Sequence, residues 1–154
     1  MKIFRQFLCV LMLLFASNSA HAHSYKQGDI SIGHIWARAT PTGATTAAIY
    51  VPLLNNGKET DSLIGASSEL ASKIEIHQDT NDNGIMKMQK LDAVTLEPNK
   101  PVSLRPNGTH LMVFGLKQQL KEGGMFPLTL QFEKAGSIKV EAMIEGVGAM
   151  SESK

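Results

Sequence analysis

Short apolar runs separated by turn residues constrain the fold more than any other feature of this sequence. Ten such runs follow Asp29, and Gly, Pro, Asn and Asp gather between them, as in residues 105–108 and 121–124. Segments of this kind are typical of strands joined by tight turns, and no segment of convincing length has a helical period. We therefore expect an all-β chain, a Greek-key sandwich or barrel in one domain. The expected strands are 30–38, 47–54, 62–66, 73–78, 85–91, 94–96, 102–104, 110–114, 128–132 and 138–144.

The first 22 residues have the composition of an export signal. Lys2 and Arg5 precede an apolar run at 7–15, and Ala20-His21-Ala22 has the small-x-small pattern of a cleavage site. A membrane anchor is the less favoured alternative, because the run is shorter than the roughly 20 residues of a spanning helix. We expect cleavage after Ala22, a mature domain at 23–154, a periplasmic location and no membrane span after cleavage.

Cysteine and charge exclude several functions. The single cysteine, Cys9, lies within the signal, too early for a lipid-anchor site, so the mature chain has no thiolate for a blue-copper centre. Removing residues 1–22 takes away two of the 15 basic residues and none of the 14 acidic ones, which leaves 13 minus 14, a net charge of −1. Without a basic block, nucleic-acid binding is not expected. No paired acid and base, activated nucleophile or phosphate-binding glycine motif points to an enzyme.

Two histidines and two methionines form a candidate metal-binding set: His77, Met88, His110 and Met112. Imidazole binds several transition metals, whereas the uncharged, polarisable thioether favours cuprous copper, so the set predicts a Cu(I) site. His110 and Met112 are two apart in an expected strand and share a face, while Leu111 points away. Residues 81–84 have turn chemistry, and a hairpin there brings His77 near Met88. The site then needs this hairpin and one strand of a neighbouring sheet.

The spacing of these four residues is improbable by accident. With 8 Met and 5 His among 154 residues, a spacing specified beforehand arises by chance in about three of ten thousand such sequences. Each residue alone has a plainer explanation, since a strand methionine usually fills a core and a lone histidine usually lies at the surface. The set as a whole therefore favours a metal site.

This spacing resembles the signature of the PCu(A)C family of periplasmic copper chaperones. Ten residues separate His77 from Met88, 21 separate Met88 from His110, and one separates His110 from Met112. The resemblance extends over residues 35–39, 65–67, 108–116 and 127–136. It implies a cupredoxin-like β-sandwich that binds Cu(I) through the four residues and passes it toward the CuA centre of cytochrome c oxidase. The implied partners are the CuA-bearing subunit or a thiol-containing assembly factor, and we expect a monomer.

Two departures from the family pattern limit the resemblance. Many members carry methionine two residues after the first histidine, where this chain has Asp79, and some carry a His- and Met-rich extension that residues 148–154 lack. A second copper site in the tail is therefore not expected. A periplasmic copper buffer without a dedicated recipient, and a sandwich module that binds only protein, remain as alternatives to delivery.

Several other residues are weighed as candidates for a role at the site. Met86 shares a strand face with Met88. It is either an additional thioether ligand or a residue that packs in the core or at its rim, and we favour packing. His23, at the expected mature N-terminus, is a candidate for a separate Cu(II) site. Trp36 is interpreted as a core anchor, and Arg38 either holds a turn or an acidic partner or is a solvated strand-end charge. His34 shares strand parity with Trp36 and is left out of the site, and Asn55 and Asp61 are interpreted as turn residues.

Overall fold

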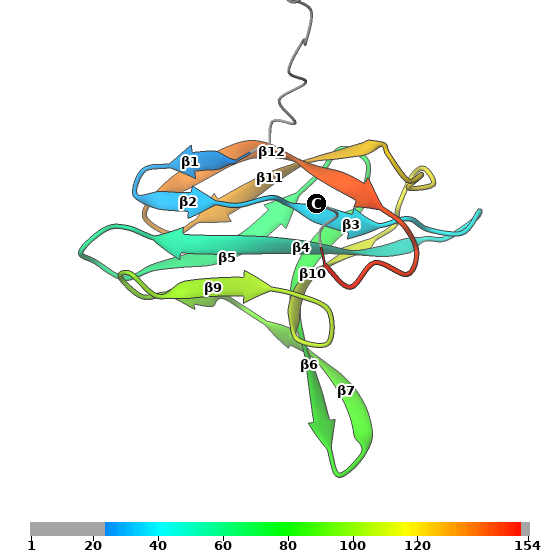
Figure 1. The fold of residues 1–154 in the computed structure, drawn as a ribbon, viewed down its shortest axis with the longest axis horizontal. Helices are drawn as coiled ribbons and strands as arrows, with labels where there is room; N and C mark the ends of the chain where they lie inside the picture. The colour runs from blue at the N-terminus through cyan, green and yellow to red at the C-terminus, as the bar shows by residue number, and fades with distance from the viewer. Residues whose placement is uncertain (1–23, 152–154) are drawn as a thin grey trace, which may run out of the picture.

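Strand β4 (Thr46–Asn55) organises the fold because it pairs with four other strands. The computed structural model describes residues 24–151, which contain twelve strands and no helix (Figure 1). The other strands are β1 (Tyr25–Gln27), β2 (Ile30–Ile32), β3 (Trp36–Arg38), β5 (Asp61–Ser67), β6 (Lys73–Asp82), β7 (Ile85–Leu91), β8 (Val94–Leu96), β9 (Pro101–Leu104), β10 (Thr109–Phe114), β11 (Met125–Phe132) and β12 (Gly136–Glu145).

The main sheet closes on itself. Its order runs β4, β10, β6, β5, β11, β12 and β3, and β3 then pairs back to β4. The β3–β12 pairing is parallel, while the other pairings around this ring are antiparallel. A closed ring leaves no unpaired edge among these strands. The expected all-β architecture is confirmed.

Alternating apolar residues fill the interior of the ring. In β4 the deeply buried apolar residues include Ile49, Val51 and Leu53, and in β11 they include Phe126, Leu128 and Leu130. Successive strand residues point to opposite faces, so this two-residue period places one apolar set in the core and leaves the intervening residues toward the outside. The sequence pattern that predicted the strands is therefore also the pattern that forms the core.

The prediction of one continuous strand at 30–38 is wrong. This segment contains two strands, β2 and β3, which pair with the C-terminal and N-terminal halves of β4 respectively. At the break the Gly33 N–H donates to the carbonyl of Pro52, and a Cβ on Gly33 would lie 3.1 Å from the Pro52 Cβ. Strand β1 was also not expected, and β6 continues four residues beyond the expected 73–78. Pairing partners, not local propensity, set these boundaries.

Asn55 and Asp61 do more than form turns, because both are buried and hold loops in place. The Asn55 side-chain amide donates to the carbonyls of Glu59 and Leu96. The Asp61 carboxylate accepts hydrogen bonds from the backbone N–H groups of Ser62, Lys134 and Ala135 at 2.7, 2.9 and 2.9 Å. Burial opposes ionisation of Asp61, but these backbone hydrogen bonds outweigh it and lower its pKa below the ordinary 3.8.

Replacing Asp61 with asparagine is expected to reduce the free energy of unfolding by about 2–3 kcal/mol at pH 7, because backbone N–H groups lose a charged acceptor. Since the folded pKa is lowered, the contribution of the carboxylate is complete above about pH 4 and declines as the pH falls further. Urea unfolding at pH 7 and pH 3 measures both effects. The exposed carboxylate of Asp92 supplies the control, Asp92→Asn, and an undiminished Asp61→Asn difference at pH 3 would contradict the assignment.

Candidate metal centre

His77 and His110 lie directly opposite each other on adjacent strands. Strands β6 and β10 pair antiparallel over six positions, and His110 is the cross-strand partner of His77. The two imidazole ring centroids are 6.3 Å apart with an interplanar angle of 47°. The expectation that His110 comes from a neighbouring sheet is therefore wrong, because β10 is hydrogen-bonded to β6 itself.

The two methionines lie on either side of this histidine pair, on the same face. Met112 is opposite Glu75 in β6, and Met88 is opposite Asp79 in the same strand. The expected β6–β7 hairpin is confirmed. The residue directly opposite His77 in β7 is Lys90, and Met88 is the next residue of β7 on the same face. Adjacent same-face positions on a strand are ~7 Å apart. The order along this face is Met112, the histidine pair and then Met88.

Exposure along this row is lowest at the histidine pair and highest at the hairpin. His110 is 4% exposed, His77 and Met112 are partly buried, and Met88 is 52% exposed. Leu111, between the two candidate ligands of β10, is 0% exposed and lies in the core cluster, as its strand parity predicts. The hairpin that carries Met88 extends beyond the body of the molecule (Figure 1). The histidine pair is therefore largely enclosed, and the Met88 end of the row is open to solvent.

Glu75 orients the ring of His77. The His77 Nε2 lies 2.9 Å from Glu75 Oε2, and the carboxylate also contacts the ammonium groups of Lys73 at 2.9 Å and Lys90 at 3.4 Å. The hydrogen bond from His77, followed by that from Lys73, lowers the pKa of Glu75 to about 2. An ionised carboxylate only accepts hydrogen bonds, so Nε2 carries the proton and Nδ1 of the neutral ring has a free lone pair. Nδ1 is buried and has no hydrogen-bond partner, as suits a metal ligand.

The ring of His110 is held by its own strand. Its Nδ1 donates to the carbonyl of Gly108 at 3.1 Å, and Asp79 Oδ2 lies 3.8 Å from the same nitrogen. Because a carbonyl oxygen only accepts, Nδ1 carries the proton and Nε2 keeps the lone pair. Outer partners of this kind commonly fix the tautomer of a metal-binding histidine. Glu75 precedes His77 by two residues, and Gly108 precedes His110 by two residues. This spacing is visible in the sequence, but by itself it does not indicate a hydrogen bond to the imidazole.

Aromatic rings border the histidine pair. Phe114 lies 5.7 Å from the ring of His77, and Tyr50 lies 6.5 Å from that of His110, both measured between centroids. Trp36 packs on Tyr50 at 4.4 Å and is buried, as expected of a core anchor. Burial raises the pKa of Tyr50, although the nearby Arg38 charge opposes this. These rings limit water access to the enclosed side of the row.

Arg38 binds the C-terminal segment of the described chain. Its Nε donates to the carbonyl of Ala149 at 2.6 Å, and its Nη2 donates to the sulfur of Met150 at 3.0 Å. The guanidinium also lies over the ring of Tyr50, 5.9 Å from the centroid. Arg38 therefore holds a chain segment in place, which is closest to the sequence interpretation that it holds a turn.

The other candidate residues lie apart from the histidine pair or outside the described chain. His34 lies by Glu145, with Nε2 3.6 Å from Oε1, in agreement with its omission from the set. Met86 is 58% exposed, so of the interpretation as core or rim packing only the rim position agrees with the structure. Within residues 24–151, no three His, Cys, Asp or Glu side chains form a metal site by themselves, so a site at His77 and His110 depends on other donors. The expected export signal and His23 precede the described residues.

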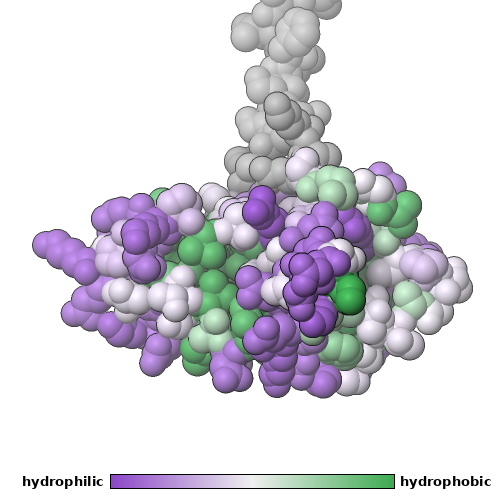
Figure 2. Space-filling view, turned by 90° about the horizontal axis from the view of Figure 1, so that it is seen from below, coloured by the Kyte–Doolittle hydropathy of each residue, from purple (hydrophilic) through white to green (hydrophobic). Residues whose placement is uncertain are grey.

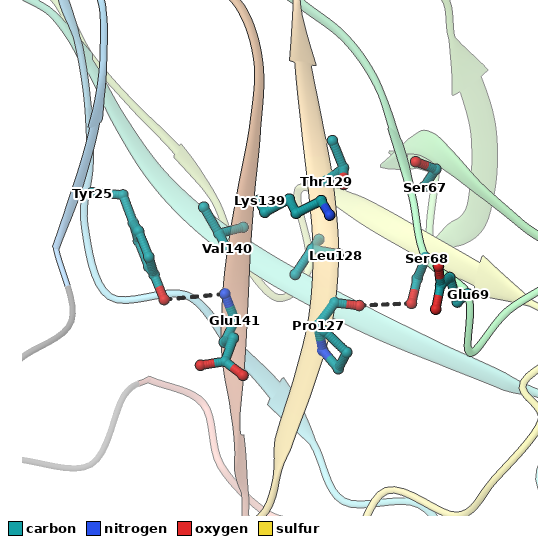
Figure 3. A pocket seen from close by; sticks show the side chains of 10 residues that line it. All are labelled: Tyr25, Ser67, Ser68, Glu69, Pro127, Leu128, Thr129, Lys139, Val140 and Glu141. Carbon is teal, nitrogen blue, oxygen red and sulfur yellow. Dashed lines mark hydrogen bonds between the residues drawn. The ribbon is translucent and has the colours of Figure 1, made fainter.

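A pocket among the described residues lies elsewhere. It has a volume of about 730 Å³ and lies along β5, β11 and β12, with Tyr25 at one side (Figure 3). Tyr25 accepts a hydrogen bond from the Glu141 N–H, and Ser68 donates one to the Pro127 carbonyl (Figure 3). No candidate metal ligand lines it. The described chain contains no helix long and apolar enough to cross a membrane.

Comparisons with known proteins agree with this architecture. Residues 30–144 match the model of the family described as "Putative lipoprotein LpqE-like". The copper-bound PCuAC domain from PmoF2 has a TM-score of 0.70 and 31% identity, covering 80% of this chain and 98% of that domain. The solution structure of the Cu(I) form of DR1885 from Deinococcus radiodurans has a TM-score of 0.61 and 25% identity, covering 82% of this chain and 83% of that one.

A curated relative comes from Leifsonia xyli subsp. xyli, where the protein Lxx21020 is also named as a lipoprotein. It is 28% identical over 130 residues, which is 83% of this chain and 77% of the relative. The family model and the PCuAC structures together cover the strands that carry both histidines and both methionines. The chain belongs to the LpqE-like, PCuAC-related family that its sequence resembles.

Proposed function

We propose that this protein is a periplasmic carrier of Cu(I), exported with cleavage after Ala22, and that His77, Met88, His110 and Met112 bind the metal. The observation that carries the proposal is the cross-strand histidine pair with a thioether on either side of it on the same face. Each imidazole has one nitrogen engaged by a protein acceptor and the other left for a metal. PCuAC relatives of this chain have been solved with copper bound.

The donor chemistry favours the cuprous ion. All four proposed ligands are neutral and two are soft sulfur donors, which suits a monovalent soft cation better than Zn²⁺ or a hard divalent ion. The nearest carboxylates are occupied otherwise, since Glu75 holds His77 and two lysines, and Asp79 faces the proton-bearing nitrogen of His110. Copper here is a cargo, and the geometry supports binding and exchange, not catalysis.

The gradient of exposure supports transfer. An enclosed histidine pair retains the ion, while Met88 at 52% exposure lets an acceptor reach it. Thiolates bind Cu(I) more strongly than thioethers do, which gives transfer its direction. We propose as recipient the CuA-bearing subunit of cytochrome c oxidase or a thiol-containing assembly factor. The alternative is a periplasmic copper buffer that uses the same ligands.

A competition titration against a cuprous chelator under reducing conditions tests the proposal. We expect one Cu(I) per chain, and no binding would overturn it. Mixing the loaded protein with a purified apo CuA domain then distinguishes delivery from buffering. Delivery also predicts that a deletion strain loses oxidase activity at low copper and regains it when copper is added, whereas a buffer predicts no such loss.

Cu(I) affinity is expected to weaken as the pH falls, because only the neutral imidazole binds metal. Chelator competition between pH 7.5 and pH 5, corrected for titration of the chelator, measures this dependence. Protons and copper compete for the same imidazole nitrogens, so the Cu(I) affinity falls as the pH falls. An affinity that stays constant from pH 7.5 to 5 is incompatible with histidine ligation.

Replacing Glu75 with glutamine is expected to weaken Cu(I) binding by about 10–100-fold, the usual effect of losing an outer partner of a metal-binding histidine. The neutral amide oxygen accepts the Nε2 proton of His77 more weakly than the carboxylate does, so the ring is held less firmly. Lys73→Gln removes another contact of the same carboxylate and leaves the hydrogen bond to His77. Equal affinities for the two variants would show that Glu75 does not act through His77.

A further inference from the structure

The outer half of the β6–β7 hairpin carries a second exposed thioether. Met86 is 58% exposed and is opposite Asn81, one same-face position beyond the pair formed by Asp79 and Met88. Every residue of β7 except its last is exposed. Figure 2, seen from the side toward which the hairpin extends, shows hydrophobic surface open to solvent among hydrophilic residues. Met86 therefore extends the row of donors outward from the histidine pair.

Packing does not account for a methionine at this position. A side chain that fills a core gap is removed from water, and this burial is the source of its contribution to stability. Met86 leaves more than half of its surface in water and gains little of this. A thioether that is accessible and flexible is instead suited to brief contact with a metal and with an incoming ligand. Its distance of ~7 Å along the strand from Met88 lets two long side chains approach the same ion.

We propose that Met86 is a transfer ligand, through which Cu(I) moves from the enclosed site to an acceptor with soft donor atoms. This inference rests on the proposed function. One Cu–S bond to Met86 forms as the bond to Met112, at the other end of the row, breaks. The acceptor then forms its own bond to copper as the remaining protein bonds break. Copper stays in the +1 state throughout, the exchange between the protein's neutral thioethers moves no proton, and a thiol acceptor releases its own proton to solvent as it binds.

A ligand used only during transfer has a distinctive effect. It lowers the barrier in both directions, so its loss slows release and loading by the same factor and leaves the equilibrium affinity unchanged. A resident ligand such as Met88 instead changes the affinity itself. These two roles are therefore separable by measuring rates and affinity on the same variant.

The test follows Cu(I) transfer between the protein and excess bicinchoninate by stopped-flow absorbance, together with equilibrium competition. For Met86→Leu we expect release and loading to slow about fivefold or more, with the affinity within twofold of wild type. Met150→Leu is the matched control, because Met150 is 61% exposed and lies beside Arg38, not on the hairpin. This control is expected to transfer at the wild-type rate.

Three results would overturn the inference. Wild-type rates for Met86→Leu would show that copper does not pass through this thioether. A loss of affinity equal to that of Met88→Leu would make Met86 a resident ligand instead. Equal slowing by Met150→Leu would assign the effect to exposed methionines in general. Failure of the wild-type protein to bind Cu(I) would reject the proposed function itself, which is a separate outcome seen in the equilibrium titration alone.

Discussion

Alanine at His77 or His110 is expected to lower Cu(I) affinity by at least ~100-fold. Loss of an outer partner of a metal-binding histidine already costs about 10–100-fold, and loss of the ligand itself removes a bond to the metal. The two histidines are direct cross-strand partners on one face, so each variant leaves a single imidazole on that rung. Competition with a cuprous chelator measures both variants, and the double variant is expected to retain no specific site.

His34→Gln is the matched control for these variants. His34 is another partly buried histidine, but it lies beside Glu145, away from the β6–β10 pair. It is expected to keep the wild-type Cu(I) affinity. Circular dichroism of each variant establishes that the sheet is retained. If a folded His77→Ala or His110→Ala protein bound Cu(I) as tightly as His34→Gln, the assignment of the histidine pair would have to be abandoned.

Leu111→Ala is expected to cost about 2–5 kcal/mol of unfolding free energy, the usual cost of truncating a buried leucine. Leu111 lies between His110 and Met112 in the sequence but points to the opposite face, where it is 0% exposed in the core cluster. Because the metal-binding face keeps all its donors, the folded variant is expected to bind Cu(I) within about threefold of wild type. Urea unfolding of the metal-free protein and chelator competition measure the two quantities.

The contrast with an exposed apolar residue tests whether burial is the cause. Ile64 is also an aliphatic residue within a strand, but it is 47% exposed. Ile64→Ala is expected to change the unfolding free energy by less than about 1 kcal/mol, as surface substitutions usually do. A similar loss of stability in both variants would contradict the assignment of Leu111 to the core. A large loss of Cu(I) affinity in folded Leu111→Ala would show that the two faces of β10 are not independent.

The sequence by itself determined the fold class and the candidate donors. Alternation with a period of two is a local property of a strand, so the placement of His110 and Met112 on one face and Leu111 on the other follows from their order in the chain. The turn chemistry at 81–84 likewise predicts the hairpin, because the residues that form a tight turn are adjacent in sequence. Softness of the thioether is a property of the side chain alone and needs no structure.

Only the tertiary structure decided which strands are neighbours. His77 and His110 form one rung because β10 lies between β4 and β6 in a closed ring, and a pairing between distant segments depends on how the whole sheet closes. The same pairings divided the expected strand 30–38 into β2 and β3. Burial also depends on neighbours, which is why local pattern placed Met86 in a packed environment although the projecting hairpin leaves it in water. The orientation of the two imidazoles also required the structure, because it depends on hydrogen bonds from His77 to Glu75 and from His110 to the Gly108 carbonyl.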